Sequence, residues 1–251
     1  MLAACNNSKA DNSFLLNQDS SFNRDSLYFV TLPPDLPSQI KNYNGFLLSF
    51  NKENGTPNYV AWELKDSEII GEAPRLKQFH QDLEIEGCPD EFAYRYSGYD
   101  RGHMCPAADQ KWSTDAMYDC FVMANIVPQH PDLNQKAWET LETKERNWAK
   151  RDGAIWIVSG PIYDESNNHR IGPYNVRVPD FCFKAFLAID VEFPRAIAFI
   201  YPNQLSPGNM QNYAVSIDQL EEITGYDFFS ALPDEIENAV EAEFSFKEWN
   251  R

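Results

Sequence analysis

The chain has 251 residues, 43% of them hydrophobic and 24% charged, which suffices for a sizeable core and excludes a wholly disordered, collagenous or coiled-coil protein. It holds no run of about 18 apolar residues, the length that a membrane-spanning helix needs. The net charge of −17 argues against a nucleic-acid ligand, because binding to phosphates relies on Lys and Arg. The segment 94–151 is nevertheless neutral, with eight basic and eight acidic residues, so the overall charge does not exclude a local anion site.

The N-terminal residues Leu2-Ala3-Ala4-Cys5 resemble the lipobox of bacterial lipoproteins, in which the cysteine carries a lipid anchor, and a polar run follows them. The basic and apolar parts of a signal peptide are missing. We expect residues 1–25 to be a disordered lipoprotein-like tether, with Cys5 as the one membrane attachment and the bacterial cell envelope or exterior as the location. An accidental match on a flexible terminus is the alternative.

Residues 26–251 are expected to form a single domain, because no internal repeat and no Gly/Ser linker divides them. Two apolar runs, 45–50 and 59–64, predict strands, and Asn54-Gly55 between them indicates a hairpin. A long polar loop is expected over 65–93. Further along the chain we predict strands over 154–159, 184–191 and 196–201, and helices over 216–224 and 233–243.

The clearest helix follows the segment 94–131 and ends at Gly153. Its buried stripe is predicted from the spacing of Trp138, Leu141, Glu145 and Trp148, in which Glu145 is the one polar member. Asp132 and Gln135 have the spacing of a capping box at its start. We also assign Trp112, Trp138, Trp148 and Trp156 to the core.

Four cysteines lie in the predicted domain, at positions 88, 105, 120 and 182. None belongs to a Cys-x-x-Cys pair, which argues against a zinc ribbon. Two disulfides, in any of three pairings, suit an exported protein, and four buried free thiols fit equally well.

Three motifs then follow one another closely: Asp100-Arg101-Gly102-His103, Asn125-Ile-Val-Pro-Gln129, and a helix carrying Asn134 and Glu142. Together they resemble the DNA/RNA non-specific endonucleases of the ββα-metal (His-Me finger) superfamily, over about Tyr43 to Tyr226. The resemblance implies an α+β fold, with a central antiparallel β-sheet, flanking helices and a ββα-metal finger. It further implies a Mg²⁺-dependent endonuclease that hydrolyses DNA and RNA with little base specificity. Mn²⁺ is the expected replacement for Mg²⁺ as the metal cofactor. A catalytically inactive nuclease-fold protein that binds a partner or polyanion at the cell surface is the alternative.

His103 is the candidate general base. An imidazole with an ordinary pKa of about 6.5 is mostly neutral near neutral pH and can take a proton from an attacking water. A purely structural histidine is the alternative, and the motif residues around His103 weigh against it.

Asn134 is the candidate metal contact. The carbonyl oxygen of an asparagine is a neutral, hard ligand that suits Mg²⁺, an ion that keeps most of its waters, and the resemblance implies this single contact. Glu142 lies eight residues further, about 80° around an α-helix and ~12 Å along it. We therefore expect Glu142 to act through the metal's waters, as the resemblance also implies. A helix cap at Asn134 and a solvated Glu142 are the alternatives.

Arg101 is expected to bind the scissile phosphate, because a guanidinium matches phosphate oxygens in bidentate fashion. A salt bridge to Asp100 is the alternative. Arg75 lies where the resemblance implies a second phosphate-binding arginine. Asn125 is expected to support the site by hydrogen bonding. The sequence carries no signal for an oligomer interface.

Overall fold

The computed structural model describes residues 22–204 and 208–251 of the chain. Cys5 and the rest of the predicted tether up to residue 21 lie outside the described residues. The tether prediction extends too far at its other end, because Arg24 and Asp25 belong to a 3₁₀ helix, η1 (Arg24–Tyr28). The Arg24 guanidinium also donates two hydrogen bonds to the Asp190 carboxylate.

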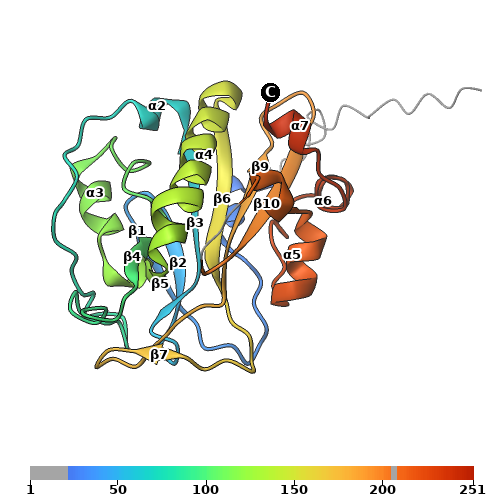
Figure 1. The fold of residues 1–251 in the computed structure, drawn as a ribbon. Coiled ribbons are helices and arrows are strands. Elements are labelled where there is room, and N and C mark those ends of the chain that lie inside the picture. Colours follow the sequence, from blue (N-terminus) through green and yellow to red (C-terminus); the bar gives the residue numbers. More distant parts are fainter. Residues whose placement is uncertain (1–21, 205–207) are drawn as a thin grey trace, which may run out of the picture.

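A seven-stranded antiparallel sheet forms the centre of the fold, in the order β1-β2-β3-β6-β9-β10-β11 (Figure 1). This arrangement confirms the predicted α+β class with a central antiparallel sheet. The strands of this sheet are β1 (Gln39–Tyr43), β2 (Phe46–Asn51), β3 (Thr56–Lys65), β6 (Ala154–Ile162), β9 (Phe181–Ala188), β10 (Arg195–Pro202) and β11 (Ala214–Val215). Two smaller pairs are β4 (Asp100–His103) with β5 (Ile126–Gln129), and β7 (Arg170–Ile171) with β8 (Val176–Arg177).

The predicted hairpin is present between β2 and β3, which pair in antiparallel register. Gly55 has a φ of +67°, a conformation that glycine adopts without the steric penalty of a Cβ. The turn signal in the sequence therefore reflects a real backbone requirement.

Helices lie against both faces of this sheet, and its inner strands β2, β3, β6 and β9 are buried on both sides, whereas the edge strand β1 is partly exposed. Along β3, Val60 and Trp62 face one hydrophobic cluster, whereas Tyr59 and Ala61 face a second one. This alternation follows from the two-residue period of a strand. The helices are α2 (Asp66–Ile69), α3 (Thr114–Cys120), α4 (Glu139–Asp152), α5 (Ile217–Thr224), α6 (Asp234–Glu241) and α7 (Phe246–Trp249), with 3₁₀ helices η2 (Met123–Asn125) and η4 (Met210–Tyr213).

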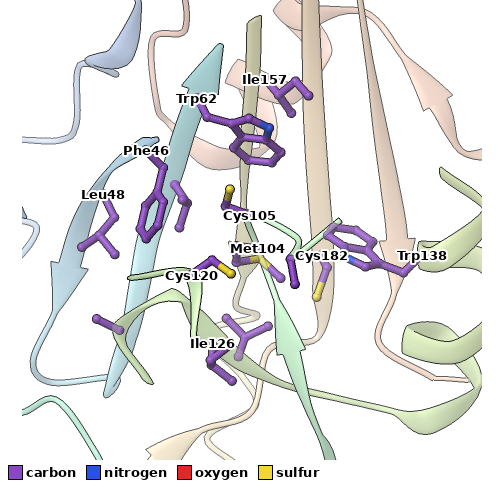
Figure 2. Close-up of a cluster of buried hydrophobic side chains, with 14 of the residues drawn as sticks. Phe46, Leu48, Trp62, Met104, Cys105, Cys120, Ile126, Trp138, Ile157 and Cys182 are labelled. Atoms are coloured by element: carbon purple, nitrogen blue, oxygen red, sulfur yellow. The ribbon is translucent and has the colours of Figure 1, made fainter. Parts of the chain in front are cut away.

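The first cluster lies between the sheet and α4 (Figure 1) and contains the three apolar members of the predicted stripe, Trp138, Leu141 and Trp148. Figure 2 shows Met104, Cys105, Cys120 and Cys182 among the aliphatic and aromatic side chains of this cluster. All four predicted-domain cysteines are free and buried, so free thiols, one of the two alternatives left open by the sequence, are what the structure contains. The second cluster packs α5 and α6 against the other face of the sheet.

The helix that contains Asn134 begins differently from the prediction. Asp132 has helical backbone angles, its side chain makes no cap hydrogen bond, and its carboxylate instead binds Lys136. The Nδ1 atom of His130 accepts the Asp132 N–H at 3.2 Å and so takes the capping role. The capping-box prediction was wrong because the helix starts at Pro131, one residue too early for Asp132 to cap it.

The following segment, η3 (Leu133–Trp138), is π-helical and continues directly into α4, which ends at Gly153 as predicted.

Trp112 is 41% exposed, so its assignment to the core was wrong, whereas the other three tryptophans assigned to the core are buried. Within the described ranges, no helix is long and apolar enough to span a membrane.

Candidate active site

A two-stranded hairpin followed by a helix carries the three sequence motifs. β4 and β5 pair antiparallel, with His103 opposite Ile126, and the η3–α4 helix follows β5 in the chain. Gly102 is required by close packing in this hairpin, because a Cβ at this position would lie 2.1 Å from Oε1 of Gln129. The predicted ββα finger is therefore present.

Five of the six predicted site residues line one cavity of about 370 Å³ beside this finger. These five are Arg75, Arg101, His103, Asn134 and Glu142. A larger cavity, of about 670 Å³, extends between Tyr99 and Asn203 and contains none of the five, so size alone does not identify the site.

His103 packs against two aromatic rings, which also contact each other, and is only 7% exposed. Its ring centroid lies 5.2 Å from that of Phe79 and 5.0 Å from that of Phe121, and its Nε2 atom is buried without a hydrogen-bond partner. Burial, together with the nearby charges of Arg75 and Arg101, lowers the pKa of His103 to about 3. The imidazole is therefore neutral near physiological pH and able to accept a proton.

The same two aromatic rings also carry the two arginines. The Arg101 guanidinium lies 4.5 Å from the centroid of Phe79, and that of Arg75 lies 5.2 Å from the centroid of Phe121. Arg101 donates to the backbone carbonyl of Glu91 at 3.2 Å. Across the described part of the chain neither guanidinium forms an ion pair, so the alternative of a salt bridge from Arg101 to Asp100 was wrong. Both cations are thus available to an anion that enters the cavity.

Asp100 instead positions the helix side of the cavity. Its Oδ2 atom accepts hydrogen bonds from Nδ2 of Asn134 at 2.9 Å and from Nε2 of Gln135 at 2.7 Å. The amide nitrogen of Asn134 is therefore engaged, which leaves its carbonyl oxygen to meet a ligand.

The π-helical turn reduces the angle about the helix axis between the side chains of Asn134 and Glu142, compared with a regular α-helix. A π turn is wider than an α turn, so each of its residues rotates by less than 100° about the axis. The offset of about 80° expected for a regular α-helix consequently shrinks, and both side chains line the same cavity.

Sequence reasoning missed Arg146, which lines the cavity from the same helix. Glu139, Glu142 and Arg146 have the spacing i, i+3, i+7 of one helix face, and this signal could have identified it. The Arg146 guanidinium is paired at 3.1 Å with the carboxylate of Asp109, which is fully buried.

Behind these groups lies a second buried ion pair, between Glu145 and Lys184, with an N–O distance of 2.8 Å. Burial and the charge of Asp109 raise the pKa of Glu142 to about 7, although Lys184 and Arg146 oppose this shift. Glu142 therefore changes between its protonated and charged forms near neutral pH. The polar position in the predicted stripe, Glu145, is explained by Lys184, which the sequence places 39 residues away.

Asn125 lies behind the cavity and does not line it. Its Oδ1 accepts the Cys105 N–H at 2.9 Å, and its Nδ2 donates to the carbonyl oxygens of Cys105 and Cys120 at 2.9 and 2.8 Å. These bonds fix the chain immediately after His103. Asn125 is thus in a position to orient His103 rather than to contact a ligand.

The donor set of the cavity fits a largely hydrated divalent ion. It offers the neutral amide oxygen of Asn134 and the carboxylate of Glu142, while the imidazole of His103 stays free to accept a proton. Among the described residues, no trio of His, Cys or acidic ligands converges at this cavity. Few protein ligands and many waters are typical of Mg²⁺ sites.

Comparison with known proteins identifies relatives along most of the chain. The family model described as DNA/RNA non-specific endonuclease matches residues 25–235. A protein named Nuclease from Nostoc sp. (strain PCC 7120) is 34% identical over 84% of this chain and 80% of its own length. Human mitochondrial Nuclease EXOG is 32% identical over 78% of this chain, a match that spans 58% of the EXOG sequence.

A solved structure has a similar fold. In a crystal structure of the EndoG/EndoGI complex, one chain aligns with a TM-score of 0.73 and 24% identity, covering 78% of this chain and 89% of the other. This agreement confirms the fold class independently of the motifs.

Proposed function

The chain belongs to the DNA/RNA non-specific endonuclease family and is a nuclease; on that premise, we propose that it is a Mg²⁺-dependent endonuclease that hydrolyses phosphodiester bonds in both DNA and RNA. The observation that carries this proposal is the neutral imidazole of His103 beside the unpaired guanidinium groups of Arg75 and Arg101. A proton acceptor next to free cations suits attack by water on an anionic phosphodiester.

In the proposed mechanism His103 accepts the proton of the attacking water. Arg101 binds the scissile phosphate, and Arg75 contributes a second cation in the same cavity. When a phosphate occupies the cavity, its negative charge offsets the two guanidinium charges that lower the pKa of His103. Substrate binding therefore strengthens the base at the moment when it is needed.

Asn134 would hold the metal ion through its carbonyl oxygen, and Glu142 would contact it through water. When bound, the ion neutralises charge on the scissile phosphate and on the departing 3′-oxygen. Asp100 keeps the Asn134 amide turned so that its oxygen is free. Because these groups contact phosphate and not base edges, we expect low base specificity. The family resemblance, with the 3′-oxygen as leaving group, implies products that carry 5′-phosphates.

Cleavage of supercoiled plasmid tests the proposal. We expect nicking in Mg²⁺ or Mn²⁺ that stops on addition of EDTA, and a loss of about 10²- to 10⁴-fold in His103→Ala, the range for removal of a general base. His169→Ala is a matched control, because His169 is exposed and lies outside the cavity.

Cleavage that persists in EDTA would contradict the metal requirement, and a fully active His103→Ala would contradict the base assignment. If folded protein leaves the plasmid intact in both metals, the alternative holds, in which the chain is an inactive polyanion-binding protein.

We also propose that the protein is attached to the bacterial cell envelope through a lipid on Cys5. The lipobox-like residues before Cys5 and the polar run after it support this. Mass spectrometry of the N-terminal peptide should find a diacylglyceryl adduct on Cys5. An unmodified cysteine in protein recovered from the cytosol would reject the anchor.

A further inference from the structure

A cluster of acidic side chains lies on the face of the sheet opposite α4. Helices α5 and α6 pack together there against the second hydrophobic cluster. Asp218 and Glu221 of α5 and Glu241 of α6 each contribute one carboxylate oxygen, and these three oxygens lie within 4.8 Å of one another. We refer to these three residues as the α5–α6 carboxylate cluster. It is separated from the candidate active site by the central sheet.

Glu241 is in an unfavourable position for a bare carboxylate. It is only 6% exposed, and its Oε1 atom is buried without a hydrogen-bond partner. It is also the last residue of α6, where the unpaired carbonyl groups of the helix give the end a partial negative charge. A buried anion at this point needs a positive partner.

Among residues 22–204 and 208–251, no Lys, Arg or His forms an ion pair with Glu241. The charges that act most strongly on Glu241 all belong to carboxylates, namely Glu221, Glu237, Asp218 and Asp227. The sequence between Ser216 and Phe246 contains no Lys, Arg or His. Arg195 on the adjacent strand β10 is already paired with Asp152.

The spacing of the oxygens matches the coordination shell of a single ion. Calcium–oxygen distances are 2.3–2.6 Å, so two ligands of one Ca²⁺ can lie up to about 5 Å apart. Glu221 is held in place, because its Oε1 accepts the Phe228 N–H at 2.8 Å and leaves its other oxygen available. Asp218 is exposed, so water can complete the shell.

We propose that Asp218, Glu221 and Glu241 bind one divalent cation of the Ca²⁺ type. Three carboxylates, one of them buried, favour Ca²⁺ over Mg²⁺, because Mg²⁺ gives up its waters reluctantly and usually takes only one or two carboxylates. The ion links the end of α6 to α5 and neutralises part of the acidic C-terminal region. This site is separate from the metal site of the proposed nuclease reaction.

Isothermal titration of the full chain with CaCl₂, in buffer with excess Mg²⁺, tests this proposal. We expect one Ca²⁺ per chain, and affinity at least tenfold weaker in Glu241→Gln and in the more conservative surface variant Asp218→Asn. Glu222→Gln is the matched control, because it removes the same charge from an exposed position of the same helix. Asn134→Ala should bind Ca²⁺ as the unmodified chain does, which keeps this result distinct from the nuclease site.

Absence of Ca²⁺ binding to the unmodified chain would overturn the proposal, as would equally tight binding by folded Glu241→Gln. A shared proton could relieve the same repulsion between carboxylates. In that case Glu241→Gln would raise the melting temperature and calcium would change nothing, which would also overturn the proposal.

Discussion

The two hydrogen bonds that Asp100 accepts provide a direct test of how the candidate metal contact is oriented. Oδ2 of Asp100 binds the side-chain amides of Asn134 and Gln135 at 2.9 and 2.7 Å. In Asp100→Ala both amides lose their acceptor. The Asn134 side chain can then rotate, and its carbonyl oxygen no longer points reliably toward the ion.

The size of the effect follows from the strength of these bonds. A hydrogen bond to a charged acceptor contributes about 1.5–3 kcal/mol. Since about 1.4 kcal/mol corresponds to a tenfold change in binding, we expect Mg²⁺ affinity to fall by about 10- to 100-fold. This range is typical for the loss of a residue that orients a metal ligand.

The assay is plasmid nicking as a function of Mg²⁺ concentration. In Asp100→Ala the half-saturating Mg²⁺ concentration should rise by that factor, and high Mg²⁺ should restore most of the rate. Asp100→Asn keeps an oxygen acceptor and should shift the titration less. Asp35→Ala, at an exposed position, controls for the loss of one negative charge. An unchanged Mg²⁺ requirement in folded Asp100→Ala would refute the reasoning.

Three other features of the structure lead to measurable expectations. Because the pKa of Glu142 is raised to about 7, protons compete with the metal below that pH, and the Mg²⁺ requirement should increase as pH falls from 7 to 6; a titration that is equally pH-dependent in Glu142→Gln would contradict this. Lys184→Met leaves the Glu145 carboxylate buried and unpaired, so urea denaturation should show a loss of about 3–5 kcal/mol, partly recovered when Glu145→Gln is added; a loss below about 1 kcal/mol would show that the pair is dispensable. Because the four described cysteines are free, a reductant should not change the melting temperature, and a clear decrease would reveal a disulfide.

Five strands of the central sheet (β2, β3, β6, β9 and β10) and the helices α4, α5 and α6 could be predicted because local sequence specifies them. The apolar run of β6 and the turn at Asn54-Gly55 are local patterns, and Gly153 ends α4 as expected. The start of the η3–α4 helix could not be predicted in the same way. The imidazole of His130 takes the capping role that the spacing assigned to Asp132. A hydrophobic pattern with a regular 3.6-residue period does not predict a π turn.

In the candidate site, too, some features could be predicted from the sequence and others could not. The motifs alone selected the residues, and five of the six selected side chains meet at one cavity. The partners of these residues were not predictable. Asp100 binds the Asn134 amide instead of Arg101, and Arg146 joins the cavity without having been selected. Such pairings depend on which segments pack together, and the one-dimensional pattern does not contain that information.

The sequence by itself determined which side chains could perform the chemistry: an imidazole, two guanidinium groups, an amide oxygen and a carboxylate at fixed positions along the chain. Only the tertiary structure decided the state of those groups. The pKa of the His103 imidazole is lowered to about 3 because Phe79 and Phe121 help to bury it and Arg75 stands nearby, all from other parts of the chain. A pKa depends on desolvation and on charges within a few ångströms, so it is determined when distant segments come together.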